Sequence, residues 1–188
     1  MRIFDFDNTL YHGESPIDLA VFMIRKNKRI LLWLPRIFWE LLKYKLCICK
    51  REAMQKQIDR FMQSCFPDKS ELDVLVKQFW KSHLHKLDMN IIGRIRPSDA
   101  VNSAGPEFLL FPIKDLLGTS TLICSKVDLE SKRVTYLNFG DRKVRRYREM
   151  FGERLIDAFY TDSFNDLPMM RLSKRVYFVR NGRIKRIK

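Results

Sequence analysis

The segment MRIFDFDNTLYHGES, residues 1–15, carries most of the information about the fold of this chain. Residues 2–6 are typical of a short buried strand, and the turn-forming residues between Asn8 and Gly13 end it. Alternate residues of a strand share a face, so we expect Asp5, Asp7 and Thr9 to converge. Carboxylates at such short distances repel each other. The arrangement therefore predicts a bound cation or a shared proton.

Length and composition favour one domain, or one domain with an inserted subdomain, because 188 residues with 46% hydrophobic side chains can bury a core. Lys and Arg outnumber Asp and Glu by 36 to 22, giving a formal charge of +14. This charge attracts anions such as phosphorylated metabolites, nucleic acid or an anionic membrane. No nucleic-acid-reading motif is present and the basic residues are spread along the chain, so we expect no nucleic acid partner.

The cysteines and the apolar segments predict a cytoplasmic protein. Four irregularly spaced cysteines do not make a disulfide framework, and Asp5 and Asp7 interrupt any signal peptide. The segment ILLWLPRIFWELLKYKL, residues 30–46, contains Arg36, Glu40 and two lysines. It therefore falls short of the ~18 apolar residues that a membrane span requires.

The order of predicted elements divides the chain into two parts. Residues 16–90 have a helical pattern, with a helix starting near Asp68 or Ser70 and a helix interrupted at Pro35. After Gly93 strands alternate with helices, and a hairpin turned by Asn181-Gly182 ends the chain. We therefore expect an α/β core from residues 1–15 and 91–188, with a parallel sheet flanked by helices, and an all-helical insertion at 16–90.

Polar residues gather where the predicted strands end, and ligands of α/β sheets bind at that edge. These residues are Asp5, Asp7, Thr9, Ser103, Asp162 and Asp166, with Lys143 near the start of a helix. Carboxylate oxygens without clustered His or Cys suit Mg²⁺, whereas hydroxyls, a lysine and helix N-termini suit a phosphate. The set is typical of phosphoryl transfer, in which a carboxylate attacks phosphorus and a second acid moves protons.

Four motifs resemble those of the haloacid dehalogenase (HAD) superfamily, in particular its subfamily IB of phosphoserine-phosphatase-like hydrolases. DFDNTL (5–10) is similar to the first motif, NSAGPEF (102–108) to the second, GDRKVRRYREMFG (140–152) to the lysine-bearing helix and TDSFNDLPMM (161–170) to the fourth. Asn8, Asn102 and Gly105 depart from the subfamily pattern without removing a catalytic group. The resemblance implies a Rossmann-like core with a helical C1-type cap.

The resemblance also implies roles for the individual residues. Asp5 would be the nucleophile that forms an aspartyl-phosphate, and Asp7 the general acid and base. Mg²⁺ would lie between Asp5, the backbone carbonyl of Asp7 and Asp162, with Asp166 in support. The phosphoryl group would be bound by Ser103 and Lys143, while Thr9 would orient the first loop beside it.

The expected substrate is a small phosphorylated metabolite or a lipid phosphate. Glu14 occupies the position of a glutamate that meets the substrate amine in phosphoserine phosphatases, and His12 would shape the entrance. The serine-specific cap motif is not recognisable, which argues against phosphoserine. Phosphoserine phosphatase is therefore kept only as the alternative. The aromatic and basic segment 29–46 suggests peripheral contact with an anionic membrane. The other interpretation is that Leu31, Leu34, Phe38, Leu41 and Leu42 form the core of the cap.

Two further alternatives have weaker support. Cys47-Ile48-Cys49 and His83-Leu84-His85 suggest zinc, but the spacing is unusual and the pairs fall on separate predicted helices. A nonenzymatic phosphate- and Mg²⁺-binding regulatory domain also uses acids, a hydroxyl and a lysine. Such receiver domains place the phosphorylated aspartate on a later strand, and they carry no insertion like residues 16–90.

Overall fold

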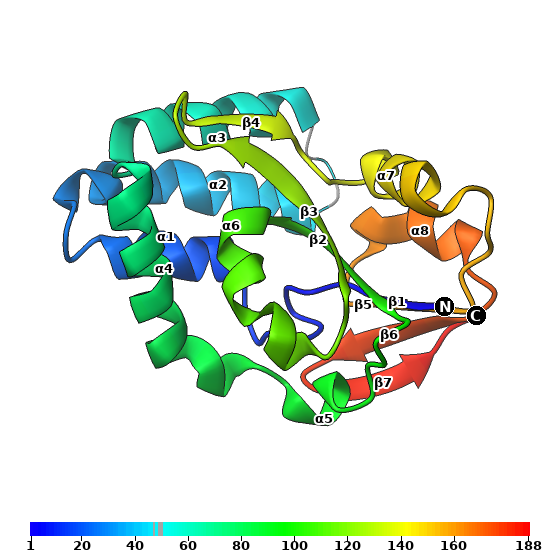
Figure 1. Ribbon diagram of the computed structural model, residues 1–188. Helices are drawn as coiled ribbons and strands as arrows, with labels where there is room; N and C mark the ends of the chain where they lie inside the picture. The colour runs from blue at the N-terminus through cyan, green and yellow to red at the C-terminus, as the bar shows by residue number, and fades with distance from the viewer. Residues whose placement is uncertain (47, 49–50) are drawn as a thin grey trace.

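Seven strands among the described residues form a mixed sheet at the centre of the fold, in the order β4-β3-β2-β1-β5-β6-β7. The computed structural model describes residues 1–46, 48 and 51–188 (Figure 1). The five central strands run parallel, and the two edge strands β4 and β7 are antiparallel to their neighbours. The strands are β1 (Arg2–Phe4), β2 (Ala100–Pro106), β3 (Thr121–Asp128), β4 (Arg133–Tyr136), β5 (Ala158–Thr161), β6 (Val176–Arg180) and β7 (Arg183–Arg186).

The helices fall into two groups along the sequence, which confirms the predicted α/β class. Between β1 and β2 lie α1 (Ser15–Met23), η1 (Lys28–Trp33), α2 (Leu34–Lys45), α3 (Arg51–Cys65), α4 (Lys69–His83), η2 (Leu84–Lys86) and α5 (Met89–Ile92). After β2 come α6 (Glu107–Leu110), η3 (Phe111–Leu117), α7 (Asp141–Phe151), η4 (Phe164–Asp166) and α8 (Leu167–Leu172). Helices α1–α4 gather on the left of Figure 1, whereas α7 and α8 lie on the right.

Two hydrophobic clusters cover the two faces of the sheet, because successive strand residues point to opposite sides. Phe4 and Val101 belong to the larger cluster, which includes residues of α1, α4, α5 and α6. Ile3 and Ala100 belong to the other cluster, beneath α7 and α8. The inserted helices therefore share a continuous core with the sheet. The domain boundaries at 15/16 and 90/91 stay a prediction.

Helix α4 shows how the sequence anchors this segment. It begins after Asp68, whose Oδ1 accepts the backbone N–H of Glu71 at 2.9 Å, as an N-cap residue does. Its buried face consists of Leu72, Leu75, Val76, Phe79 and Trp80. The indole N–H of Trp80 donates to the carbonyl of Leu109 at 2.7 Å. This bond ties α4 directly to the helix that follows β2.

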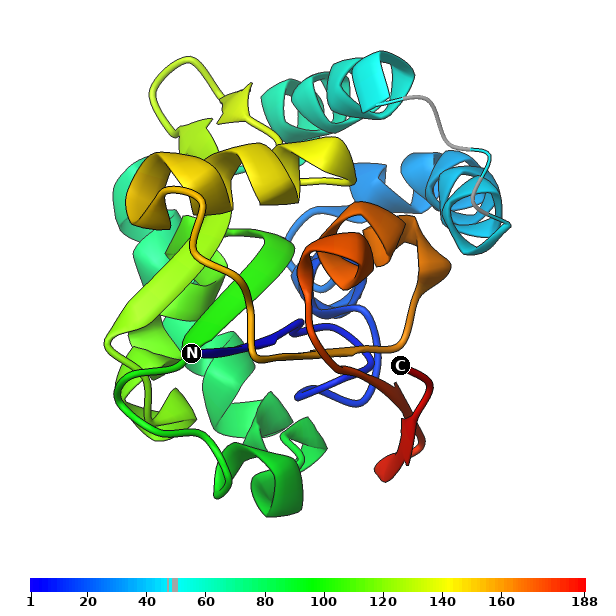
Figure 2. The same cartoon turned by 90° about the vertical axis from the view of Figure 1, so that its right-hand side faces the viewer.

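Helix α3 packs against the β3–β4 hairpin at the edge of the sheet, and Figures 1 and 2 show the two elements side by side. Two hydrogen bonds fasten them together. The amide of Gln55 donates to the carbonyl of Val134 at 2.8 Å, and Asp59 Oδ1 accepts the Val134 N–H at 2.7 Å. The inserted helices thus contact the core at its edge strand as well as at its face.

Pro35 lies in the first turn of α2, after the 3₁₀ segment η1, so the helix is divided where the sequence predicts. The second interpretation of this region, a core formed by its leucines and Phe38, is wrong for the side chains that the structure describes. Leu31, Phe38 and Leu42 are exposed and Leu34 is half-buried, whereas the side chain of Leu41 lies outside those described. Trp33 and Ile37 face inward, and this leaves the opposite stripe of the helix outward. The described helices include none long and apolar enough to span a membrane.

Candidate active site

The loop that follows β1 carries the first pair of carboxylates. Strand β1 ends at Phe4, and the N–H of Asp5 donates to the carbonyl of Tyr160 in the neighbouring strand β5 at 2.8 Å. The chain then turns, because the carbonyl of Phe6 accepts the N–H groups of the three residues from Thr9 to Tyr11. The expectation that Asp5, Asp7 and Thr9 share one strand face is therefore wrong. A turn, not a continued strand, sets their directions.

Lys143 of α7 reaches the end of β1 and forms the centre of the site. Its Nζ lies 2.7 Å from Asp5 Oδ1 and 2.8 Å from Asp166 Oδ1. The three residues are between 2% and 5% exposed. Burial lowers the pKa of Lys143, but the two carboxylates outweigh it and raise the pKa above its ordinary value. The hydroxyl of Thr161 donates to Asp166 Oδ2 at 2.9 Å and completes this buried cluster.

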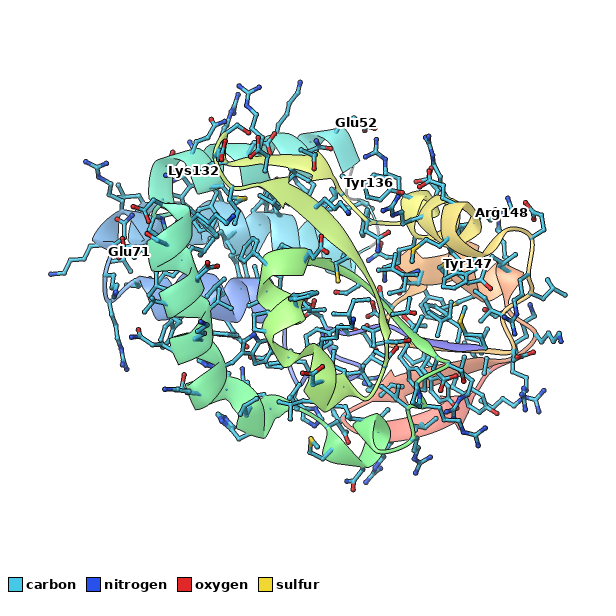
Figure 3. All side chains as sticks on the ribbon, in the orientation of Figure 1. Glu52, Glu71, Lys132, Tyr136, Tyr147 and Arg148 are labelled. Atoms are coloured by element: carbon cyan, nitrogen blue, oxygen red, sulfur yellow. The ribbon has the colours of Figure 1, made fainter. Side chains whose placement is uncertain are left out.

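Contacts between β4 and α7 fix the start of the helix that carries this lysine. Figure 3 shows Tyr136 at the end of β4, beside α7. Its hydroxyl donates to the carbonyl of Arg142 at 2.9 Å, and the Arg142 guanidinium lies 5.2 Å from the centre of its ring. The lysine is thus held from the strand edge as well as from the helix.

The carboxylates around Lys143 carry more negative charge than one lysine offsets. Burial is the main cause that raises the pKa of Asp5 to about 7, with Lys143 opposing and Asp166 adding to it. Burial likewise raises the pKa of Asp162 to about 8, and the charge of Asp5 is the next cause. Asp162 follows β5, which pairs directly with β1, so the two carboxyl groups lie at neighbouring strand ends.

This surplus of carboxylate oxygen fits a magnesium ion. Among the described residues no group of three or more His, Cys, Asp or Glu side chains forms a complete metal cage. Magnesium does not require one, since it commonly binds through one or two carboxylates and keeps water or phosphate oxygens for its other positions. Asp5 and Asp162 could supply those two carboxylates, whereas Asp166 is engaged by Lys143 and Thr161.

Asp7 joins the carboxylate loop to the first inserted helix. Its Oδ1 accepts the backbone N–H of Ser15, the first residue of α1, at 2.6 Å. Burial raises the pKa of Asp7 well above its ordinary value, with the nearby Glu14 as the second cause. Glu14 in turn accepts the side-chain amide of Asn8 at 2.7 Å. Asn8 has a φ of 55°, a conformation that asparagine tolerates better than most residues.

Ser103 lies close to Asp7 across Gly105. The hydroxyl oxygen of Ser103 accepts the N–H of Gly105 at 2.9 Å. A Cβ atom added to Gly105 would lie 3.1 Å from Ser103 Oγ and 3.7 Å from Asp7 Oδ2. The glycine thus occupies the narrow space between the two side chains, where a larger residue would press on the serine.

The remaining two candidates lie differently. Thr9 is 2% exposed, and its Oγ1 has no hydrogen-bond partner among the residues described. It lies in the same loop as Asp5 and Asp7, the acids that would bind a ligand. His12 is half exposed, and its Nε2 lies 3.5 Å from Asp88 Oδ2. The imidazole of His12 therefore faces Asp88 and the turn at Gly182 and does not join the residues around Asp7.

The proposed zinc ligands gain no support. Cys47 and Cys49 lie outside the described residues. His83 is stacked on Phe79, with ring centres 4.1 Å apart, and its Nδ1 lies 2.9 Å from the carbonyl of Phe79. These contacts explain the position of His83 as packing on its own helix.

A buried amide network behind Ser103 was not anticipated. The side-chain amide of Asn138 donates to Asn102 Oδ1 at 2.7 Å, to the carbonyl of Ser103 at 2.8 Å and to the carbonyl of Ile123 at 3.2 Å. Both asparagines are fully buried. The polar Asn102 within an otherwise apolar strand is the sequence signal for such a network, because a buried amide requires partners.

An apolar cavity of about 240 Å³ begins at Asp7 and Glu14 and extends between the inserted helices and the β3–β4 hairpin. Helices α1, α2 and α3 line one side, with residues such as Ile17, Ile37 and Ile58. Strands β2, β3 and β4 line the other with Ala104, Val127 and Val134. The cavity and the carboxylate cluster thus meet at Asp7.

A buried cluster of acids around a lysine lies at the carboxyl end of the parallel strands. The family model for haloacid dehalogenase-like hydrolases matches residues 3–171, and the chain belongs to this family. The resemblance expected from the four motifs is confirmed at this level. No curated protein matches the sequence significantly.

Several solved structures share the fold of this chain. A protein of unknown function from Bordetella pertussis Tohama I has a TM-score of 0.76 at 19% identity, covering 94% of this chain and 87% of that one. A phosphoserine phosphohydrolase-like protein from Francisella tularensis has a TM-score of 0.66 at 17% identity, covering 94% of this chain and 86% of that one. A phospho-aspartyl intermediate analogue of phosphoserine phosphatase has a TM-score of 0.58 at 15% identity, covering 93% of this chain and 83% of that one. At these identities the likeness shows the fold alone.

Proposed function

We propose that this protein is a Mg²⁺-dependent phosphatase that hydrolyses a phosphate monoester through an aspartyl-phosphate on Asp5. The observation that carries the proposal is the buried contact of Lys143 with Asp5, two residues before Asp7, which lies across Gly105 from Ser103. A cation, a hydroxyl and two carboxyl groups are thus present at this edge of the sheet. This is the set of groups that phosphoryl transfer to a carboxylate requires.

The reaction follows from the positions of the two carboxyl groups. A carboxylate oxygen of Asp5 forms a bond to phosphorus while the bond from phosphorus to the ester oxygen breaks, and Asp7 gives its proton to the departing alcohol. Water then attacks the phosphorus, Asp7 takes back a proton, and the bond to Asp5 breaks. Inorganic phosphate leaves, and both residues return to their starting state.

Lys143, Ser103 and Thr9 hold the phosphoryl group and the loop beside it in this proposal. Lys143 places its charge next to the attacking carboxylate, and Ser103 keeps its hydroxyl hydrogen as a donor because its oxygen accepts from Gly105. Asp5, the backbone carbonyl of Asp7 and Asp162 would hold the magnesium, with Asp166 in support through Lys143. When bound, the ion offsets charge on the phosphoryl oxygens.

The proposal is tested by release of phosphate from p-nitrophenyl phosphate with Mg²⁺. We expect turnover by the native chain, its loss in Asp5→Asn and its retention in Asp73→Asn, a matched change on the exposed side of α4. A stable phosphoryl adduct on Asp5 without turnover would instead favour a nonenzymatic regulatory domain. Equal turnover in Asp5→Asn and the native chain would refute the nucleophile.

The substrate is a small phosphorylated metabolite or a lipid phosphate in this proposal, with phosphoserine as the alternative. Glu14 favours phosphoserine, because its carboxylate lies near Asp7 where a substrate amine would meet it. The comparison is the specificity constant kcat/KM for phosphoserine against glycerol phosphate. A preference for phosphoserine that disappears in Glu14→Gln would establish the alternative.

We further propose that the outer face of η1 and α2 contacts an anionic membrane. Leu32, Phe38 and Trp39 are 80%, 66% and 56% exposed, and Lys28 and Arg29 lie exposed at the start of the same segment. Apolar side chains next to cations suit the surface of an anionic bilayer. Flotation with phosphatidylglycerol vesicles at low salt tests the idea, with Phe38→Ser as the variant and Phe111→Ser, which is 59% exposed elsewhere, as the control. A native protein that stays wholly unbound would refute it.

A further inference from the structure

The cavity that begins at Asp7 has a wall that is almost entirely hydrocarbon and aromatic. Its lining includes Ile17 and Ala20 of α1, Trp33 and Ile37 of η1 and α2, and Ile58 and Phe61 of α3. At about 240 Å³ it is larger than a packing defect, since apolar cavities of about 150 Å³ can stay dry and take up small apolar molecules. The wall is therefore able to hold a small carbon skeleton away from water.

The polar groups on this wall are mostly engaged by the protein itself. The hydroxyl of Ser125 donates to the carbonyl of Ala104 at 2.6 Å and accepts the N–H of Asn138 at 2.9 Å. Glu40 pairs with Lys43 at 2.8 Å, and the Arg36 guanidinium lies 5.3 Å from the ring centre of Trp33. A polar or charged ligand group placed against the hydrocarbon wall, away from Glu14, Arg36 and Gln57, would lose water without gaining partners, and that is costly.

The position of Asp7 relates this cavity to the reaction. The acid that protonates the departing ester oxygen must lie within hydrogen-bond distance of it. Asp7 lines the cavity, and it lies next to Gly105 and Ser103 on the side of the phosphoryl site. With the phosphoryl group at Asp5 and Lys143, the carbon attached to the ester oxygen points past Asp7 into the apolar space.

We infer that the preferred substrate is a phosphate monoester with an apolar alkyl or aryl leaving group, and that the wall formed by Ile17, Ile37 and Ile58 selects it. This inference rests on the proposed phosphatase function. It distinguishes such an ester from phosphoserine, whose leaving group carries an amine and a carboxylate. Among the described residues, the cation that lines the cavity is Arg36, and its guanidinium is stacked on Trp33.

The test is a series of alkyl phosphates from ethyl to octyl, below their micelle concentrations, with phenyl phosphate and phosphoserine as further arms. Burying one methylene in an apolar site corresponds to about a fourfold gain in kcat/KM. We expect that rise at each step until the cavity is full, and phosphoserine at least tenfold below butyl phosphate. A continued preference for octyl over phenyl phosphate would indicate an alkyl, lipid-like source, and the reverse an aromatic metabolite.

A cavity-filling variant separates the wall from the rest of the fold. Ile58→Trp should lower the ratio of kcat/KM for octyl over ethyl phosphate at least tenfold. The control is Val74→Trp, at a position of α4 that is 50% exposed, and it should keep the native ratio. Thermal unfolding followed by circular dichroism shows whether each variant is folded under the assay conditions. A second variant, Ile58→Ala, should shift the chain length at which kcat/KM stops rising to longer alkyl phosphates.

The outcomes distinguish the two levels of the proposal. If the native protein releases phosphate from every ester at the same rate regardless of chain length, or prefers phosphoserine, the apolar leaving group is refuted while the phosphatase function stands. If it releases phosphate neither from any of these esters nor from p-nitrophenyl phosphate, the phosphatase function itself fails. An Ile58→Trp ratio equal to that of the native protein would refute the assignment of the wall.

Discussion

The Nζ atom of Lys143 lies 2.7 Å from Oδ1 of Asp5, although 138 residues separate them in the sequence. This contact joins the first strand of the chain to α7, and Asp166 joins it from the segment that follows β5. One buried cation thus neutralises charge from two separate parts of the sheet. Removing one partner of such an arrangement leaves uncompensated charge in the interior.

The first prediction follows from this contact. Lys143→Met should lower the free energy of unfolding by about 3–5 kcal/mol, because Asp5 and Asp166 lose their buried cation. It should also abolish phosphate release. Urea unfolding in the absence of Mg²⁺ measures the first effect. Lys185→Met, an exposed position of β7, is the control, and equal stability of the two variants would contradict the structural role of Lys143.

The second prediction concerns Asp7. Asp7→Asn should reduce kcat by about 10²–10⁴-fold, the typical contribution of a general acid. The amide oxygen can still accept the Ser15 N–H, so the loop should remain in place. Beryllofluoride, which imitates the phosphoryl group on aspartate, should bind Asp7→Asn and fail to bind Asp5→Asn. Binding to both variants would show that Asp5 is not the nucleophile.

The third prediction concerns magnesium. Chelation by EDTA should abolish phosphate release, and excess Mg²⁺ should restore it, because Asp5 and Asp162 together lack a sufficient counter-charge. Asp162→Asn should require more Mg²⁺ for half-maximal activity than the native chain. The control is Asp115→Asn, a change at an exposed residue of η3. Full activity after exhaustive chelation would rule out the metal.

The fourth prediction tests the buried amide network. Asn138→Leu should lower the free energy of unfolding by about 3 kcal/mol, since it leaves Asn102 Oδ1 and the Ser103 carbonyl without their donor. Replacing both asparagines by leucine should lower the free energy of unfolding by less than the sum of the two single changes. The hydrogen bond between Asn138 and Asn102 is counted in both single changes but is lost only once in the double variant. Urea unfolding of the four proteins gives this comparison, and strict additivity would contradict the coupling.

The fifth prediction concerns thiol reactivity. Burial is the main cause that raises the pKa of Cys124 to about 12, with Glu107 and Asp7 adding to it, and burial also raises the pKa of Cys65. The reactive thiolate is therefore scarce at neutral pH. In a Cys47→Ser, Cys49→Ser background, iodoacetamide should label neither thiol until urea unfolds the chain. Because the folded state holds the proton more tightly, Cys124 should make stability fall as pH rises from about 9 toward 12.

The sequence predicts the sheet and the charged centre well, because both depend on local patterns. The face of α4 follows from apolar residues at helical spacing, and Asp5, Asp162 and Lys143 follow from acids and a lysine at element ends. The family resemblance adds the order of these motifs. Such features need no knowledge of distant contacts.

Features that depend on tertiary contacts could not be predicted in the same way. The end of β1 at Phe4 results from a turn closed on the carbonyl of Phe6. The partner of Asn102 is 36 residues away, and nothing in its local sequence identifies Asn138. The outward position of Phe38 depends on which face of α2 lines the cavity, and a helix that is apolar on both faces does not reveal this choice.

The hydrogen bond from the Ser15 N–H to Asp7 has a mechanical consequence. Ser15 is the first residue of α1, so a motion that carries Ser15 away from Asp7 together with this helix must break that bond. An open conformation would leave the proton donor without its backbone anchor, and closing over a substrate would realign it. Entry of the ester and readiness for proton transfer would then be two readouts of the same movement.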